Sequence, residues 1–265
     1  MPLIDISFSF ANLLILFKIL IFIVSPILIL KRSYFFVNCV IIILVIDVSN
    51  KKKLEILYED KFLIIVNKPS NLLTISTEKE KDRTLYSYAY DYLKKKNKNN
   101  KVFIVHRLDK DTSGIVMFAK DESIKFYLQD NWDNIKRNYV AIVNGKVKNK
   151  KGVLKSYLME TKTHLTYSVN DKNGKLAITE YEKVLENNKY TMLSLNLKTG
   201  RKNQIRVQLS DMGNSIVGDK KYGIKKDPIR RMALHANYME FIHPKTKEKI
   251  IIDIDIPNSF ISLMK

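Results

Sequence analysis

The segment that most restricts the fold of this chain is VFIVHRLDKDTSGIVMFAK, residues 102–120. Two apolar, strand-forming runs flank a polar turn that ends at Gly114. Strand-forming runs joined by turn residues predict a β-hairpin, and glycine adopts a positive φ that other residues rarely adopt. Arg107 and Asp109 stand close together where the first run meets the turn. The segment therefore predicts a rigid hairpin that presents a cation and a carboxylate at its mouth.

The residues after position 50 alternate between short strands and amphipathic helices. Apolar positions at helical spacing predict helices over 84–98, 123–134 and 201–213. Strands are predicted over 62–67, over 137–145 and repeatedly between 156 and 197. Because short turns connect successive strands, we expect an α+β fold with a mixed, mainly antiparallel central sheet and flanking helices.

The first 50 residues form an apolar segment unlike the rest of the chain. The run LLILFKILIFIVSPILIL, residues 13–30, and a second apolar run over 35–46 permit one or two membrane spans. Three interpretations stay open: a membrane anchor, a targeting segment, or translated sequence upstream of the true start. We prefer the last, because the domain over 51–265 accounts for all the chemistry. Membrane association is expected only through residues 1–48.

The charge of the chain points to a polyanionic partner. There are 46 Lys and Arg against 27 Asp and Glu, a net charge of +19, which attracts RNA, DNA or an anionic membrane surface. A Lys-rich surface also arises for solubility alone, so charge by itself does not decide. The single cysteine, Cys39, excludes an intramolecular disulfide, and the four scattered histidines have no metal-ligand spacing. No metal site is expected.

Five segments in order resemble the RluA family of pseudouridine synthases, which modify ribosomal and transfer RNA. HRLDKDTSG matches the H-R-L-D-x-x-T-S-G signature, and the resemblance extends from about residue 54 to residue 257. The other four segments are IIVNKPSNLLTIS, KRNYVAIVNGKV, LKTGRKNQIRVQLSDMGNSIVGDKKYG and LHANYMEFIHPKTKE. The resemblance implies the pseudouridine synthase catalytic fold over residues 51–265, without an S4 RNA-binding domain. It also implies a monomeric, cytoplasmic enzyme that acts on 23S ribosomal or transfer RNA and uses no metal, nucleotide or other cofactor.

Pseudouridine formation breaks the C1′–N1 bond of uridine, rotates the uracil and rejoins it through C5. The reaction needs no redox step, but it does need an anionic oxygen beside the sugar and the base. The resemblance assigns this oxygen to Asp109, whose alternative role is to cap a turn. An enclosed carboxylate tends to protonate, and a neighbouring guanidinium favours its charged form. By resemblance, Arg206 is that guanidinium.

Two more residues receive roles from the resemblance. Tyr139 is expected to stack on the displaced uracil, with its hydroxyl where a proton leaves C5. Arg107 is expected to fill the space that the target nucleotide vacates when it turns out of its helix. Further RNA contacts are expected from Lys68, His106, Thr112, Arg201, Lys202, Asn203 and Gln204. The basic loops 94–101, 146–155 and 220–231 should contact phosphates, which adds affinity without sequence choice.

Four positions depart from the family pattern: Asn203 and Gln208 replace histidines, Ser215 a proline and Asn71 a glycine. Two other functions therefore stay in view. One is an RNA-binding protein that keeps the fold but has lost catalysis, and the other is a membrane-tethered domain that binds anionic lipid. Because Asp109, Tyr139 and Arg206 are all present, the enzyme is the preferred interpretation.

Overall fold

A computed structural model of the chain describes residues 54–265 except positions 79, 171 and 225–227. The predictions for residues 1–50 lie outside the described residues. Residues 54–265 form one unit. In that part of the chain, no helix is both long enough and apolar enough to span a membrane.

Within the described residues, eleven strands join into one sheet. Its main path runs β1-β2-β4-β10-β5-β9-β8-β6-β7, with β3 on β4 and β11 on β10. All named strand pairs are antiparallel except β4 with β10, which confirms the predicted mixed, mainly antiparallel sheet. The strands are β1 (Glu55–Glu59), β2 (Leu63–Lys68), β3 (Phe103–Ile104), β4 (Ser113–Ala119), β5 (Lys136–Asn144), β6 (Lys151–Glu160), β7 (Thr166–Val169), β8 (Lys175–Glu186), β9 (Tyr190–Leu197), β10 (Leu234–Ile242) and β11 (Lys249–Asp253).

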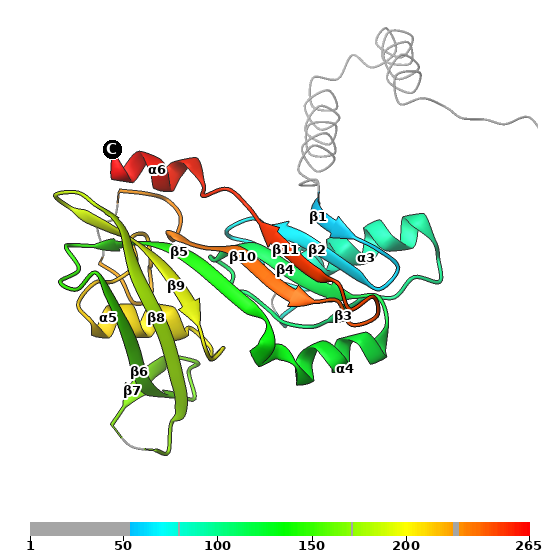
Figure 1. Cartoon of the computed structure of the whole chain (residues 1–265), viewed down its shortest axis with the longest axis horizontal. Helices are drawn as coiled ribbons and strands as arrows, with labels where there is room; N and C mark the ends of the chain where they lie inside the picture. Colours follow the sequence, from blue (N-terminus) through cyan, green and yellow to red (C-terminus); the bar gives the residue numbers. More distant parts are fainter. Residues whose placement is uncertain (1–53, 79, 171, 225–227) are drawn as a thin grey trace, which may run out of the picture. The chain divides into compact units, whose positions relative to one another are not determined.

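Four α-helices flank the sheet in the described part: α3 (Leu85–Lys96), α4 (Glu122–Asp130), α5 (Gln204–Asp211) and α6 (Asn258–Met264) (Figure 1). The first two confirm predicted helices, and a 3₁₀ turn over Trp132–Asn134 completes the second. Thr84 begins α3 with a capping box, because its hydroxyl accepts from the Ser87 N–H while the Ser87 hydroxyl accepts from the Thr84 N–H.

The apolar run of β2 is continuous because a helix covers each face of the strand. Leu63 and Ile65 pack in one cluster with α4, and Ile64 and Val66 pack in another with α3. Figure 1 shows the two helices on either side of β2 and β4. Each fully buried side chain of this kind contributes about 1.5–3 kcal/mol to the free energy of unfolding. The two packed layers therefore hold the ends of the loops that leave the sheet in fixed positions.

The parallel contact between β4 and β10 fixes the predicted hairpin. Ser113 lies opposite His235, and Gly114 lies opposite Ala236. Gly114 has a φ of +119°, and a Cβ at this position would lie 2.2 Å from the Ala236 carbonyl oxygen. The glycine is therefore required for both its conformation and its lack of a side chain. The loop between β3 and β4, which carries Arg107 and Asp109, leaves the sheet at this point.

Candidate active site

The loop that carries Asp109 is held by the segment that follows β2. The Lys68 ammonium donates to three backbone carbonyls, including those of Leu72 at 2.7 Å and Lys110 at 3.0 Å. The Thr74 hydroxyl donates to the Leu108 carbonyl at 2.8 Å. These bonds fix the backbone on both sides of Asp109, so the position of its carboxylate is set before any substrate arrives.

Lys68, which was expected to contact RNA, is fully buried. Burial lowers the pKa of Lys68 to about 7, while the nearby charges of Asp111 and Asp109 oppose this shift. Its ammonium is engaged with carbonyls and has no exposed surface to offer a phosphate. The expected RNA contact is thus not available here, and the side chain instead positions the loop.

Arg206 lies beside Asp109, as predicted, but two of its three guanidinium nitrogens donate to a second carboxylate, that of Asp219. Its Nη1 is 3.3 Å from Asp109 Oδ2. Its Nε and Nη2 donate to the two oxygens of Asp219 at 2.7 and 2.8 Å, in a bidentate pair. The Asp219 side chain is completely buried, whereas that of Asp109 is 26% exposed. Asp109 is therefore the carboxylate of this trio that a ligand can reach.

The trio is electrostatically coupled. Burial raises the pKa of Asp219, but hydrogen bonds and charge from Arg206 outweigh burial and lower it overall. For Arg206, burial lowers the pKa, and Asp219 together with Asp109 raises it overall. Both partners are thus charged at neutral pH, and the guanidinium is a fixed cation next to Asp109.

Asn203 and Tyr222 orient the guanidinium further. Asn203 Oδ1 accepts from Arg206 Nη1 at 3.1 Å, and Asn203 Nδ2 donates to the Tyr222 hydroxyl at 3.2 Å. The Arg206 guanidinium carbon lies 5.1 Å from the centre of the Tyr222 ring. Asp219 and Tyr222 have no role among the sequence-based predictions, although both belong to the GDKKYG portion of a segment that resembles the family.

Tyr139 reaches the same place from the centre of the sheet. It lies on β5, where it pairs with Ala236 of β10 and Leu195 of β9. Burial raises the pKa of Tyr139 to about 12, with Arg137 opposing and Asp109 adding to the shift. The phenol is therefore protonated at neutral pH and presents an aromatic face together with a neutral hydroxyl.

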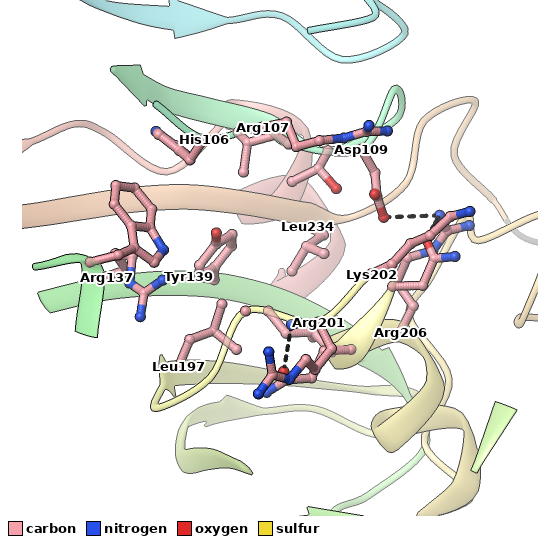
Figure 2. Close-up of a pocket in the computed structure, with 17 residues that line it drawn as sticks. His106, Arg107, Asp109, Arg137, Tyr139, Leu197, Arg201, Lys202, Arg206 and Leu234 are labelled. Carbon is pink, nitrogen blue, oxygen red and sulfur yellow. Dashed lines mark hydrogen bonds and ion pairs between the residues drawn. The ribbon is translucent and has the colours of Figure 1, made fainter. Parts of the chain in front are cut away.

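A pocket of about 370 Å³ joins these groups, a size suited to a small ring system. Figure 2 shows the Asp109–Arg206 contact on one side, with Tyr139 and Leu234 in the middle of the view. Every predicted site residue except Lys68 lines this pocket: His106, Arg107, Asp109, Thr112, Tyr139, Arg201, Lys202, Asn203, Gln204 and Arg206. Asp109 and Arg206, the ion pair in this pocket, are 97 positions apart in the sequence.

His106 and Arg107 are neighbours in the sequence, but they differ in charge and in exposure to solvent. His106 Nε2 accepts from the Met117 N–H at 3.0 Å, and its ring centre lies 4.5 Å from that of Trp132. Burial, with a further contribution from Arg137, lowers the pKa of His106 to about 3. His106 is thus a neutral wall of the pocket rather than a cation. Arg107 is exposed at the pocket edge, where its charge is available to RNA.

The turn before α5 differs from its predicted helical form. The helix begins at Gln204, and Asn203 precedes it in the left-handed region with φ 53°. Gln204 Oε1 accepts from the Arg201 N–H and from the Thr199 hydroxyl, which folds the chain into a turn. Arg201 and Lys202 consequently project from a turn at the pocket edge, not from the helix.

Residues 62–211 match the family described as RNA pseudouridylate synthase. The chain belongs to this family. It is 34% identical over 209 residues to the uncharacterized RNA pseudouridine synthase YhcT of Bacillus subtilis, covering 77% of this chain and 69% of that protein. It is also 34% identical over 222 residues to ribosomal large subunit pseudouridine synthase C of Buchnera aphidicola, covering 79% and 69%.

A solved structure shares the fold of this pseudouridine synthase. The protein called human RNA pseudouridylate synthase domain containing 4 superposes with a TM-score of 0.66 at 22% identity, covering 78% of this chain and 90% of the human chain. The recognised family and the predicted fold class are confirmed. The protein is an RNA pseudouridine synthase, an isomerase, and RNA is its partner.

The pKa of His106 predicts that acid destabilises this pseudouridine synthase. The folded-state pKa of about 3 lies below the ordinary 6.5, so the unfolded chain takes up the proton first and stability is lost as pH falls from 6.5 towards 3. The loss from this group between pH 7 and pH 5 is about 2 kcal/mol. Urea unfolding at both pH values should show that His106→Asn removes this share of the difference. An undiminished difference in the variant would contradict the assignment.

Proposed function

We propose that this chain isomerises one or a few uridines in a structured ribosomal or transfer RNA, with Asp109 as the nucleophile. The observation that carries the proposal is the meeting of a reachable carboxylate, a fixed guanidinium and an aromatic ring in one pocket. Asp109 attacks the sugar or assists departure of the uracil, while Arg206 keeps the carboxylate charged.

The chemistry balances with the residues present. The C1′–N1 bond breaks, the uracil turns, and C5 bonds to C1′, which releases the Asp109 carboxylate from the sugar where it has attacked C1′. The freed carboxylate can then take the proton from C5, and N1 gains a proton, so that atoms and electrons balance. Tyr139 stacks on the uracil during this rotation. Because its raised pKa keeps the phenol neutral, the ring is better suited to stacking than the hydroxyl is to accepting the C5 proton.

Arg107 holds the target nucleotide outside its helix. Its side chain is exposed at the rim of the pocket, one residue removed from Asp109. Turning a nucleotide out costs roughly a few kcal/mol, and a planar guanidinium can stack on the bases that remain. The short spacing between Arg107 and Asp109 places the gap next to the reacting base.

An RNA-binding protein without catalysis is less well supported. Asp219 and Asn203 both hold the guanidinium towards Asp109, and such an arrangement serves no evident purpose in binding alone. The lipid-binding alternative depends on residues 1–48, which lie outside the described residues.

The test is pseudouridine mapping of unmodified 23S rRNA and tRNA transcripts after incubation with the full chain. We expect pseudouridine at one or a few positions. The Arg107→Ala chain should modify the same positions, with a larger loss of rate at a base-paired site than in a single-stranded fragment, where less energy is needed to expose the base. No pseudouridine in either RNA would contradict the proposed function.

A further inference from the structure

A second cavity of about 370 Å³ adjoins the active-site pocket. The two share Gly200, Arg201 and Lys202, so only the turn before α5 separates them. The remaining walls come from the end of β6, the first residue of β7, the turn before β8 and the first residue of β8: Leu158, Met159, Glu160, Thr166, Asn173 and Lys175. No role in the isomerisation requires this second space.

The cavity carries excess positive charge. Lys202 and His164 both pair with Glu160, which neutralises the one carboxylate in the wall. Lys175 is exposed, and among the described residues it makes no side-chain hydrogen bond or ion pair. Arg201 donates from Nε to the Leu176 carbonyl at 3.0 Å, which is an uncharged partner. Two cations therefore face this space without a counter-charge in the described part of the chain.

The wall is also suited to a sugar. Met159, which is 37% exposed, and the buried Leu158 both line the cavity, so part of its wall is apolar. A ribose has apolar faces and a phosphate at each end. An apolar wall beside two uncompensated cations fits that combination better than it fits an inorganic ion alone.

We propose that this second cavity binds the sugar-phosphate of a nucleotide adjacent to the target uridine. The inference depends on the proposed function, because it takes the first pocket as the place of the target base. Neighbouring nucleotides are covalently joined, so they must occupy adjoining spaces. In this arrangement the RNA strand crosses the turn 198–203. The target uracil lies near Asp109, and the phosphate of the adjacent nucleotide lies between Lys175 and Arg201. Such a contact sets position and affinity, and it does not select a base.

The test measures binding of the full chain to an unmodified 23S rRNA transcript over a series of salt concentrations. Losing one phosphate contact should make the salt slope shallower by about 0.7–0.9 and raise Kd about tenfold at low salt. We expect this for Lys175→Ala and not for Lys172→Ala, which removes an exposed lysine nearby that lies outside both cavities. Lys175→Arg should retain the parental slope.

Equal losses in the Lys175 and Lys172 variants would indicate general surface charge and overturn the inference, as would an unchanged Kd and slope in Lys175→Ala. Failure of the proposed function looks different. In that case the parental chain forms no pseudouridine in 23S rRNA or tRNA transcripts, while Lys175→Ala still weakens binding more than Lys172→Ala does.

Discussion

Asp109→Asn is expected to lower the rate of pseudouridine formation at saturating RNA by roughly 10³-fold or more. The amide keeps the size of the carboxylate and an oxygen that can accept from Arg206, but it has no anionic oxygen to attack the sugar or take a proton. The measurement is a single-turnover assay on the RNA that the parental chain modifies.

The structure indicates that this loss would be chemical and not a failure to fold. Asp109 is partly exposed, and Arg206 keeps its bidentate partner Asp219 when Asp109 is changed. The free energy of unfolding and the Kd for RNA should therefore remain close to the parental values. Asp130→Asn removes an exposed carboxylate on α4, outside the pocket; it is the control and should keep the parental rate. An Asp109→Asn chain that works at that rate would rule out the proposed nucleophile.

Asp219→Asn is expected to reduce the free energy of unfolding by about 3–5 kcal/mol. The variant leaves the guanidinium of Arg206, only 7% exposed, without its bidentate partner in a buried site. Asp109 still lies 3.3 Å from Nη1 of Arg206, but it is partly exposed and does not replace the bidentate pair. Most of the desolvation cost of Arg206 therefore stays without compensation. Urea unfolding of the two chains measures the difference directly.

Two comparisons make this second prediction specific. Asp211→Asn removes an exposed carboxylate from α5, the helix that carries Arg206. It should change the free energy of unfolding by no more than about 0.5 kcal/mol. Replacing Arg206 and Asp219 together, with Met and Leu, should cost less than the sum of the single changes, because no charge is left buried alone. Additive losses would show that the two side chains are not coupled.

Two of the four departures from the family pattern, Gln208 and Asn71, have physical explanations away from the reacting groups. Gln208 is buried and accepts from the Thr179 hydroxyl at 2.6 Å while donating to the Ala177 carbonyl at 3.1 Å, which fastens α5 to β8. Asn71 has a φ of 63°, a conformation that asparagine tolerates better than most residues. Asn203, in contrast, contacts Arg206 itself and belongs to the site.

The basic loops also contain both residues that support the fold and residues that remain exposed. Arg231 belongs to the basic loop 220–231, which is expected to contact phosphates, but its Nη2 donates to the Ser113 hydroxyl and its guanidinium carbon lies 4.9 Å from the centre of the Phe260 ring. It supports the start of β4. The lysines at the end of α3 are mostly exposed, and their expected contact with phosphate stays a prediction.

The sequence by itself determined the hairpin, the positive φ of Gly114 and the mainly antiparallel sheet, and the resemblance of its ordered motifs to a known family identified most of the residues that meet in the pocket. These follow from turn chemistry, from the period of apolar residues and from ordered motifs, all of which act over short stretches of chain. Only the tertiary structure decided that Lys68 is buried under the loop that carries Asp109, that Asp219 forms the bidentate pair with Arg206, and that a second charged cavity adjoins the first. Burial and charge pairing depend on which distant segments of the chain meet in the fold. The spacing of residues within one segment does not indicate which other segments it will contact.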